Sequence, residues 1–172
     1  MGLANLALGK YDQAKVNFRK ALSLKEDYID ALNNYGLALQ KNRQFDEAIE
    51  IFDRALKLDH NSLRAFNNLG KACFEKGDLD KAEKVFCNGL KINSSYVPIL
   101  RNLVDLYLLA RKLSEAEKIV MSILDENPKS ADAYNALGAI YEKKEDFVRS
   151  EKYLRKALSL NPNLFAAKRN LI

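Results

Sequence analysis

The chain has 172 residues and a net charge of +5, with one His, two Cys and no Trp. A catalytic triad would depend on His60 alone, and Cys73 and Cys87 are too few for a metal cage or a disulfide framework, so we expect no enzyme activity, cofactor or bound metal. Basic and acidic residues are interleaved and no apolar stretch reaches the roughly 18 residues of a membrane span, which argues against nucleic-acid and membrane partners.

One pattern recurs along the chain every 34 residues. The segment ALNNYGLALQKNRQFDEAIEIFDRALKLD from Ala31 returns in related form from Ala65, Ile99 and Ala133, without insertion or deletion. We number each unit 1 to 34 from Ile29. The predicted division is a single repeat array with these segments: a partial repeat at 1–28, full repeats at 29–62, 63–96, 97–130 and 131–164, and the start of a further or capping helix at 165–172.

Each unit contains two stretches of apolar or small residues at helical spacing. Position 8 holds Gly2, Gly36, Gly70, Val104 and Gly138; position 20 is Ala or Ser, and position 28 is always Leu. Turn residues such as Gly77 and Asp78 separate the two stretches. Each unit is therefore predicted to be a helical hairpin.

Two details of the hairpins are also predicted. The second helix is expected to be capped at position 18 by Asp12, Asp46, Asp80 or Ser114, the last in a capping box with Glu117. Repeat 97–130 has Val104, Val120 and Ile123 in columns that hold other residues elsewhere, and we favour compensated packing over a functional hinge there.

These columns resemble the tetratricopeptide repeat over the whole chain, because Leu-Gly, Tyr, Ala, Phe, Ala and Pro occur at that family's offsets. The resemblance implies an all-α, right-handed superhelical solenoid of antiparallel helix pairs. Neighbouring pairs stack and share a core because one hairpin cannot bury both its faces. Cys73 and most aromatic residues, including Phe147, fall in columns that we assign to this core.

In the resembled family, first-helix positions 2, 5, 6, 9, 12 and 13 line a concave groove. The resemblance therefore places the peptide-binding groove at Asn33, Asn34, Leu37, Arg64, Asn67, Asn68, Lys71, Phe74, Arg101, Asn102, Asp105, Leu108 and Asn135. The Asn column can pair with a peptide backbone, or it can serve solvation and contacts between helices. Phe74 is the expected anchor, unless it is a core residue.

The function that we expect is a non-enzymatic scaffold or adaptor that binds a peptide or helix of a partner protein. The alternatives are the substrate-recruiting arm of a larger enzyme, for example a glycosyltransferase, and a scaffold that self-assembles through its array ends. The Lys, Asn and Arg set of the family's chaperone-binding carboxylate clamp is never complete here. The first unit begins at position 7, so we expect the chain to be cut from a longer protein; without a signal peptide, a cytoplasmic location is expected.

Overall fold

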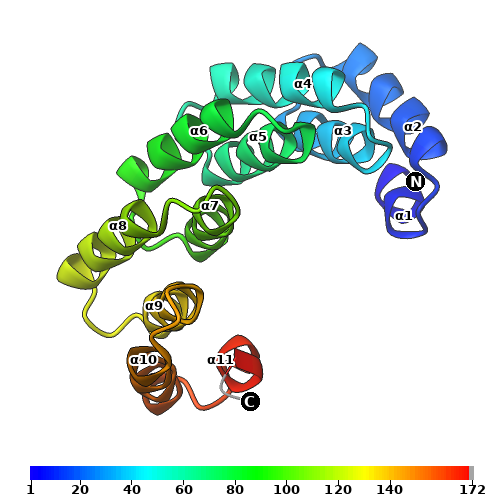
Figure 1. Cartoon of the computed structure of the whole chain (residues 1–172). Coiled ribbons are helices and arrows are strands. Elements are labelled where there is room, and N and C mark those ends of the chain that lie inside the picture. Colours follow the sequence, from blue (N-terminus) through cyan, green and yellow to red (C-terminus); the bar gives the residue numbers. More distant parts are fainter. Residues whose placement is uncertain (171–172) are drawn as a thin grey trace. The chain divides into compact units, whose positions relative to one another are not determined.

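The computed structural model describes residues 1–170, which form helices joined by short turns and contain no strand. Two compact units make up the chain, at residues 1–92 and 93–172 (Figure 1). The first unit contains α1 (Gly2–Ala7), α2 (Tyr11–Leu24), α3 (Ile29–Lys41), α4 (Phe45–Leu58), α5 (Leu63–Lys76) and α6 (Leu79–Ile92). The second contains α7 (Val97–Leu109), α8 (Leu113–Glu126), α9 (Ala131–Lys143), α10 (Phe147–Leu160) and α11 (Phe165–Asn170).

The helices recur at the same 34-residue interval as the sequence pattern. Every first helix from α3 onward begins at position 1 of its unit, and every second helix spans positions 17 to 30. In each unit the chain reverses direction between the two helices at position 15, where the backbone has positive φ: 71° at Gly9, 60° at Arg43, 94° at Gly77, 55° at Arg111 and 61° at Glu145. The predicted helical hairpins are confirmed.

The predicted caps at position 18 are wrong. Because the second helices begin at position 17, that residue lies within the first turn and not at the N-cap, and an acidic side chain there favours the positive end of the helix dipole. In two hairpins a side chain at position 16 is the cap: Asp78 accepts from the Lys81 amide at 3.1 Å and Asp146 accepts from the Arg149 amide at 3.0 Å. Lys10, Gln44 and Lys112 at the same position make no side-chain cap hydrogen bond. Ser114 makes no capping box, since the residue before α8 is Lys112.

Close packing between the two helices of a hairpin explains the Gly column. A Cβ added to Gly36 would lie 2.5 Å from a ring carbon of Phe52, and one added to Gly70 would lie 2.4 Å from a ring carbon of Phe86. Both rings are fully buried, so neither has room to move. In the 97–130 repeat, Val104 and Val120 are both buried in the same two columns, which agrees with the expected compensation of volume.

Two core predictions have different outcomes. Cys73 is fully buried as predicted, and this burial raises the pKa of its thiol to about 11. Phe147 is 66% exposed, so its prediction as a core residue is wrong. Phe45 and Leu113, which likewise begin their helices at position 17, are half-buried, so the column does not predict the exposure of Phe147.

Candidate ligand-binding faces

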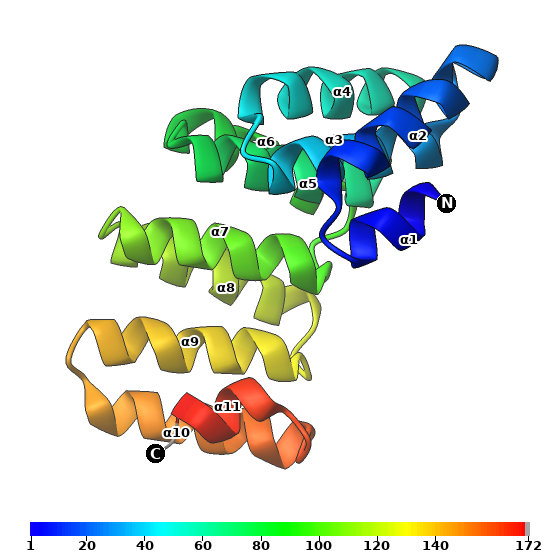
Figure 2. The same ribbon diagram turned by 90° about the vertical axis from the view of Figure 1, so that its right-hand side faces the viewer.

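The second unit has a pocket of about 650 Å³ lined by its first helices, α7, α9 and α11. Figure 2 shows α7 and α11 on the same side of this unit, with α9 between them. The apolar part of the lining comprises Val97, Leu100, Val104, Leu108, Ala136, Ala139, Phe165 and Ala166, and the polar part comprises Arg101, Asp105, Asp132, Asn135, Glu142, Lys143, Arg169 and Asn170. Among the described residues of the lining there is no Ser, Thr, Cys, His or Tyr, and thus no hydroxyl, thiol or imidazole.

Contacts between neighbouring helices fix part of this polar lining. Arg101 of α7 forms an ion pair with Asp132 of α9, with 3.8 Å between Nη2 and Oδ1. Asn170 of α11 donates from Nδ2 to Oδ1 of Asn135 at 3.4 Å. The polar groups of three successive repeats are therefore held in register across the pocket.

Asp105 lies one helical turn beyond Arg101 on α7. Partial removal from water raises the pKa of the Asp105 carboxyl above its ordinary value, while the nearby positive charge of Arg101 opposes this change. Among residues 1–170, no ion pair joins Asp105 to a basic residue, since Arg101 is directed at Asp132. Asp105 is nonetheless an exposed residue, so its carboxylate is only partly desolvated and has no ion-pair partner among the described residues.

The equivalent face of the first unit, on α3 and α5, is held by a different polar network. Arg64 of α5 pairs with Asp30 at 3.2 Å and donates to Oδ1 of Asn34 at 2.9 Å. Further along the same helices, Gln40 donates from Nε2 to Glu75 at 2.8 Å. Lys71 lies 3.8 Å from Glu75 and completes this group.

Two of the predicted groove residues lie inside this unit. Asn33 is 2% exposed and donates to the carbonyl oxygen of Ile29 at 3.1 Å, so it does not reach the groove surface. Asn68 is 7% exposed. Asn33 Oδ1, Asn68 Nδ2 and Gln40 Oε1 are buried without a hydrogen-bond partner among the described residues.

The remaining predicted groove residues divide between the units. The pocket brings together Arg101, Asp105, Leu108 and Asn135, and leaves out the half-buried Asn102. Asn34 lines a smaller pocket of about 300 Å³ with residues of α1 to α3, while Leu37, Asn67 and Phe74 are half-buried on α3 and α5. The half-buried state of Phe74 leaves both its interpretations open.

The pocket also contains residues that the sequence analysis did not select as binding residues. Asp132, Ala139, Glu142 and Lys143 occupy groove positions 2, 9, 12 and 13 of the 131–164 repeat, so carrying the columns one repeat further finds them. Arg169 and Asn170 follow in the same way at positions 5 and 6. Val97, Leu100 and Val104 come from other columns, and no groove signal marks them.

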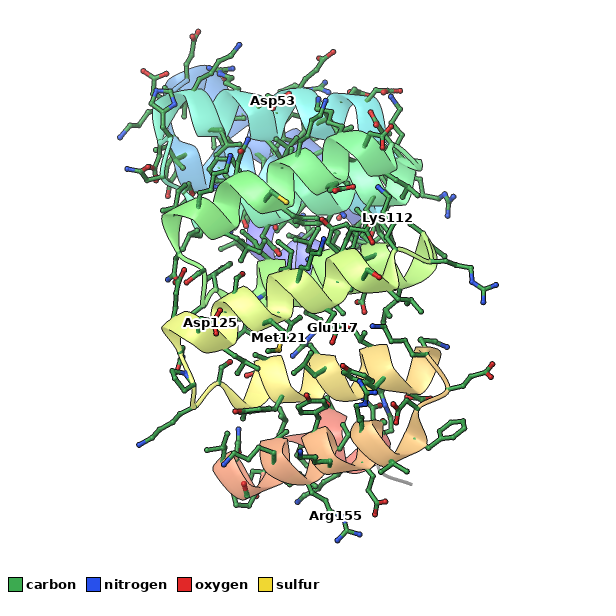
Figure 3. All side chains as sticks on the ribbon, turned by 60° about the vertical axis from the view of Figure 1, so that its left-hand side comes forward. Asp53, Lys112, Glu117, Met121, Asp125 and Arg155 are labelled. Atoms are coloured by element: carbon green, nitrogen blue, oxygen red, sulfur yellow. The ribbon has the colours of Figure 1, made fainter. Side chains whose placement is uncertain are left out.

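A second polar cluster in this unit lies away from the pocket. The carboxylate of Glu117 on α8 accepts hydrogen bonds from Lys144 and from the hydroxyl of Tyr141, and Figure 3 shows Glu117 on the side of α8 nearest α9. Arg149 donates to the same hydroxyl at 3.2 Å. The hydrogen bonds from Lys144 and Tyr141 lower the pKa of Glu117. This cluster ties α8, α9 and α10 together.

Other kinds of site are not found in the described part of the chain. Residues 1–170 contain no group of three or more His, Cys, Asp or Glu side chains that could hold a metal ion. No helix in that range is long and apolar enough to cross a membrane.

Comparison of the sequence with models of protein families identifies the family of this repeat array. Models of the tetratricopeptide repeat match residues 2–42, 27–95, 73–140 and 131–164. The chain is a tetratricopeptide repeat protein. Members of this family are typically non-catalytic scaffolds for protein interactions, and the all-helical fold supports that general role here.

Solved structures of other tetratricopeptide repeat proteins have the same fold. MamA has a TM-score of 0.73 and 23% identity, over 94% of this chain and 95% of that chain. YrrB, described as a tetratricopeptide repeat protein with an unusual peptide-binding site, has a TM-score of 0.64 and 20% identity, over 98% and 87% of the two chains. A protein from Parabacteroides merdae has a TM-score of 0.75 and 18% identity, over 99% of this chain and 68% of its own. Comparison with curated sequences gives no match.

Proposed function

We propose that this chain is a non-enzymatic scaffold that holds an extended peptide segment of a partner protein in the pocket lined by α7, α9 and α11. The observation that supports this proposal is the pocket itself, whose volume of about 650 Å³ is within the range of small-ligand sites. It combines an apolar lining with a few polar groups held by contacts between helices, as specific binding sites do.

The chemistry of the lining favours binding over catalysis. A hydrolytic site that uses a Ser, Thr or Cys nucleophile with a His base cannot be built from the described lining, which offers no hydroxyl, thiol or imidazole. A peptide suits the site because Asn135 and Asn170 present amide groups, which can match the donors and acceptors of a backbone. The peptide-binding site described for YrrB makes a peptide the first class of ligand to test.

The test is a selection of random octapeptides displayed on phage, with the intact chain as bait. Dissociation constants of the enriched peptides are then measured for the wild type and for Ala139→Trp, which adds a large side chain inside the pocket. The matched control is Ser159→Trp on the exposed surface of α10. Circular dichroism verifies that both variants remain helical.

We expect Ala139→Trp to weaken binding at least tenfold and Ser159→Trp to leave it unchanged. The pocket is not the binding site if the enriched peptides bind the two Trp variants equally well, or if no peptide is enriched.

A further inference from the structure

The charges of the pocket follow the axes of its helices in layers. Asp132 lies at position 2 of its repeat, Arg101 and Arg169 at position 5, and Asp105 at position 9. Glu142 and Lys143 follow at positions 12 and 13 at the end of α9. Helices α7 and α9 share positions 5, 9 and 12 in the lining, and the charged residues among the lining positions form acidic, basic, acidic and mixed layers along the pocket.

Only part of this charge is neutralised inside the pocket. Arg101 and Asp132 form an ion pair across α7 and α9. Asp105 has no such partner among the described residues. Arg101 lies one turn before it on α7, and its other neighbours in the lining are apolar: Val104 precedes it, Leu108 follows one turn later, and Ala139 holds the same repeat position on α9. Asp105 is exposed in the free protein, but a bound segment would cover it, and the attraction between charges is stronger where water is partly excluded.

We infer that the pocket selects a peptide segment carrying one Lys or Arg side chain, whose charged group pairs with Asp105 while its aliphatic stem packs on Leu108 and Ala139. This inference rests on the proposed function and adds the chemistry of the ligand. Lys and Arg fit such a place because their stems cover apolar surface while their heads reach a charge. The lining also contains Arg169 on α11 and Lys143 on α9, which would repel further positive charges, so the segment carries an isolated basic residue among apolar ones.

The octapeptide selection described above supplies the probe. We expect enriched sequences to contain a Lys or Arg flanked by apolar residues. One such peptide is synthesised with a fluorescent label in two forms, with its basic residue and with norleucine in that place, which keeps an aliphatic stem and removes the charge.

Affinity for the two peptides is measured on the wild type, on Asp105→Asn and on Asp125→Asn. Asp125 is an exposed acid on α8, outside the pocket lining, and it is labelled in Figure 3. We expect Asp105→Asn to weaken the basic peptide at least tenfold and the norleucine peptide less than twofold. Asp125→Asn should change neither.

The outcomes separate this inference from the proposed function. If enriched peptides lack a basic residue but lose binding in Ala139→Trp, the pocket binds peptides and the inference is overturned. Equal weakening of the basic peptide by Asp105→Asn and Asp125→Asn also overturns it, because the effect would then come from overall charge. If no enriched peptide is sensitive to Ala139→Trp, the proposed function fails as well.

Discussion

Asp105 and Glu117 are acids of the same unit in opposite environments. Partial desolvation disfavours the charge on Asp105, whereas hydrogen bonds from Lys144 and Tyr141 favour the charge on Glu117. One pKa is raised and the other lowered, so the two side chains affect the free energy of unfolding in opposite directions as pH changes.

For Asp105, the neutral Asn variant should be the more stable protein at pH 7. The folded state holds its proton more tightly than the unfolded state, so the ionised carboxylate destabilises the fold above the folded pKa and has no such effect below the unfolded value of about 3.9. We expect Asp105→Asn to raise the midpoint of thermal unfolding at pH 7 by about 1 °C at most, because Asp105 is exposed and solvent screens its charge. Calorimetry at pH 7 and pH 3 tests this; a lower midpoint at pH 7 would contradict it.

Ionisation of Glu117 has the opposite effect on the stability of the fold. Its lowered pKa means that its contribution to stability is present above the unfolded value of about 4.3 and is lost as pH falls through the folded value. Glu117→Gln should therefore reduce the free energy of unfolding by about 1.5 kcal/mol at pH 7, the typical value of a hydrogen bond to a charged group. Urea unfolding at pH 7 and pH 3 measures the effect, and an equal loss at both pH values would show that charge is not its cause.

At the scale of secondary-structure elements, each hairpin has one tight contact between positions 8 and 24. Gly70 on α5 faces Phe86 on α6, while Val104 on α7 and Val120 on α8 occupy the same positions in the next repeat. The two pairs distribute side-chain volume differently between the two helices.

This contact can be tested by exchanging one pair for the other. Gly70→Val should cost about 2–3 kcal/mol, because the buried ring of Phe86 has no room to give way. Adding Phe86→Val should recover much of that loss, since the double variant reproduces the pair at Val104 and Val120. Chemical unfolding of the single and double variants gives the coupling energy. Strict additivity of the two effects would contradict the packing argument.

The reversal between the helices depends on backbone conformation. Gly77 has φ of 94°, and no neighbouring atom lies within 4 Å of an added Cβ, so Gly77→Ala changes only the backbone preference. We expect a loss of about 1 kcal/mol in the free energy of unfolding. Arg43→Gly, at the same position of another repeat, is the matched control and should show no comparable loss. If Gly77→Ala leaves the free energy of unfolding unchanged, the turn tolerates another conformation.

At the scale of the whole molecule, the repeat period accounts for what the sequence could predict about the fold. A fixed offset shows which positions are equivalent, so helical hairpins, the buried Cys73 and the valines of repeat 97–130 followed from comparing columns. The first residue of each second helix could not be predicted from the repeat pattern, because acidic residues at positions 16 and 18 are both plausible caps. The exposure of Phe147 was missed because its column is half-buried at Phe45.

The same comparison located part of the candidate site. Comparison of repeat positions selected Arg101 and Asp105 as groove residues. It did not predict that Arg101 would pair with Asp132, because that contact depends on how α7 and α9 are spaced. The burial of Asn33 and Asn68 depends on the rotation of α3 and α5 about their own axes. A repeat pattern does not fix that rotation to within one residue.

The net charge of +5 is dispersed over the chain. Arg64 pairs with Asp30, Lys76 with Asp46 and Lys81 with Asp53, so much of the basic surface is already matched by acids. We therefore expect no binding of a labelled DNA duplex at about 150 mM salt and protein concentrations up to about 100 µM. Fluorescence anisotropy measures this. Binding that weakens steeply with added salt would contradict the expectation.

The equal length of the repeats also affects how such a chain can change over time. Because equivalent helices begin at the same position of successive units, a duplication or loss of one whole repeat in the gene keeps every later helix in phase. Point substitutions on the exposed positions of the first helices can then diversify binding without disturbing the buried columns. The number of repeats and the chemistry of their faces can therefore evolve separately.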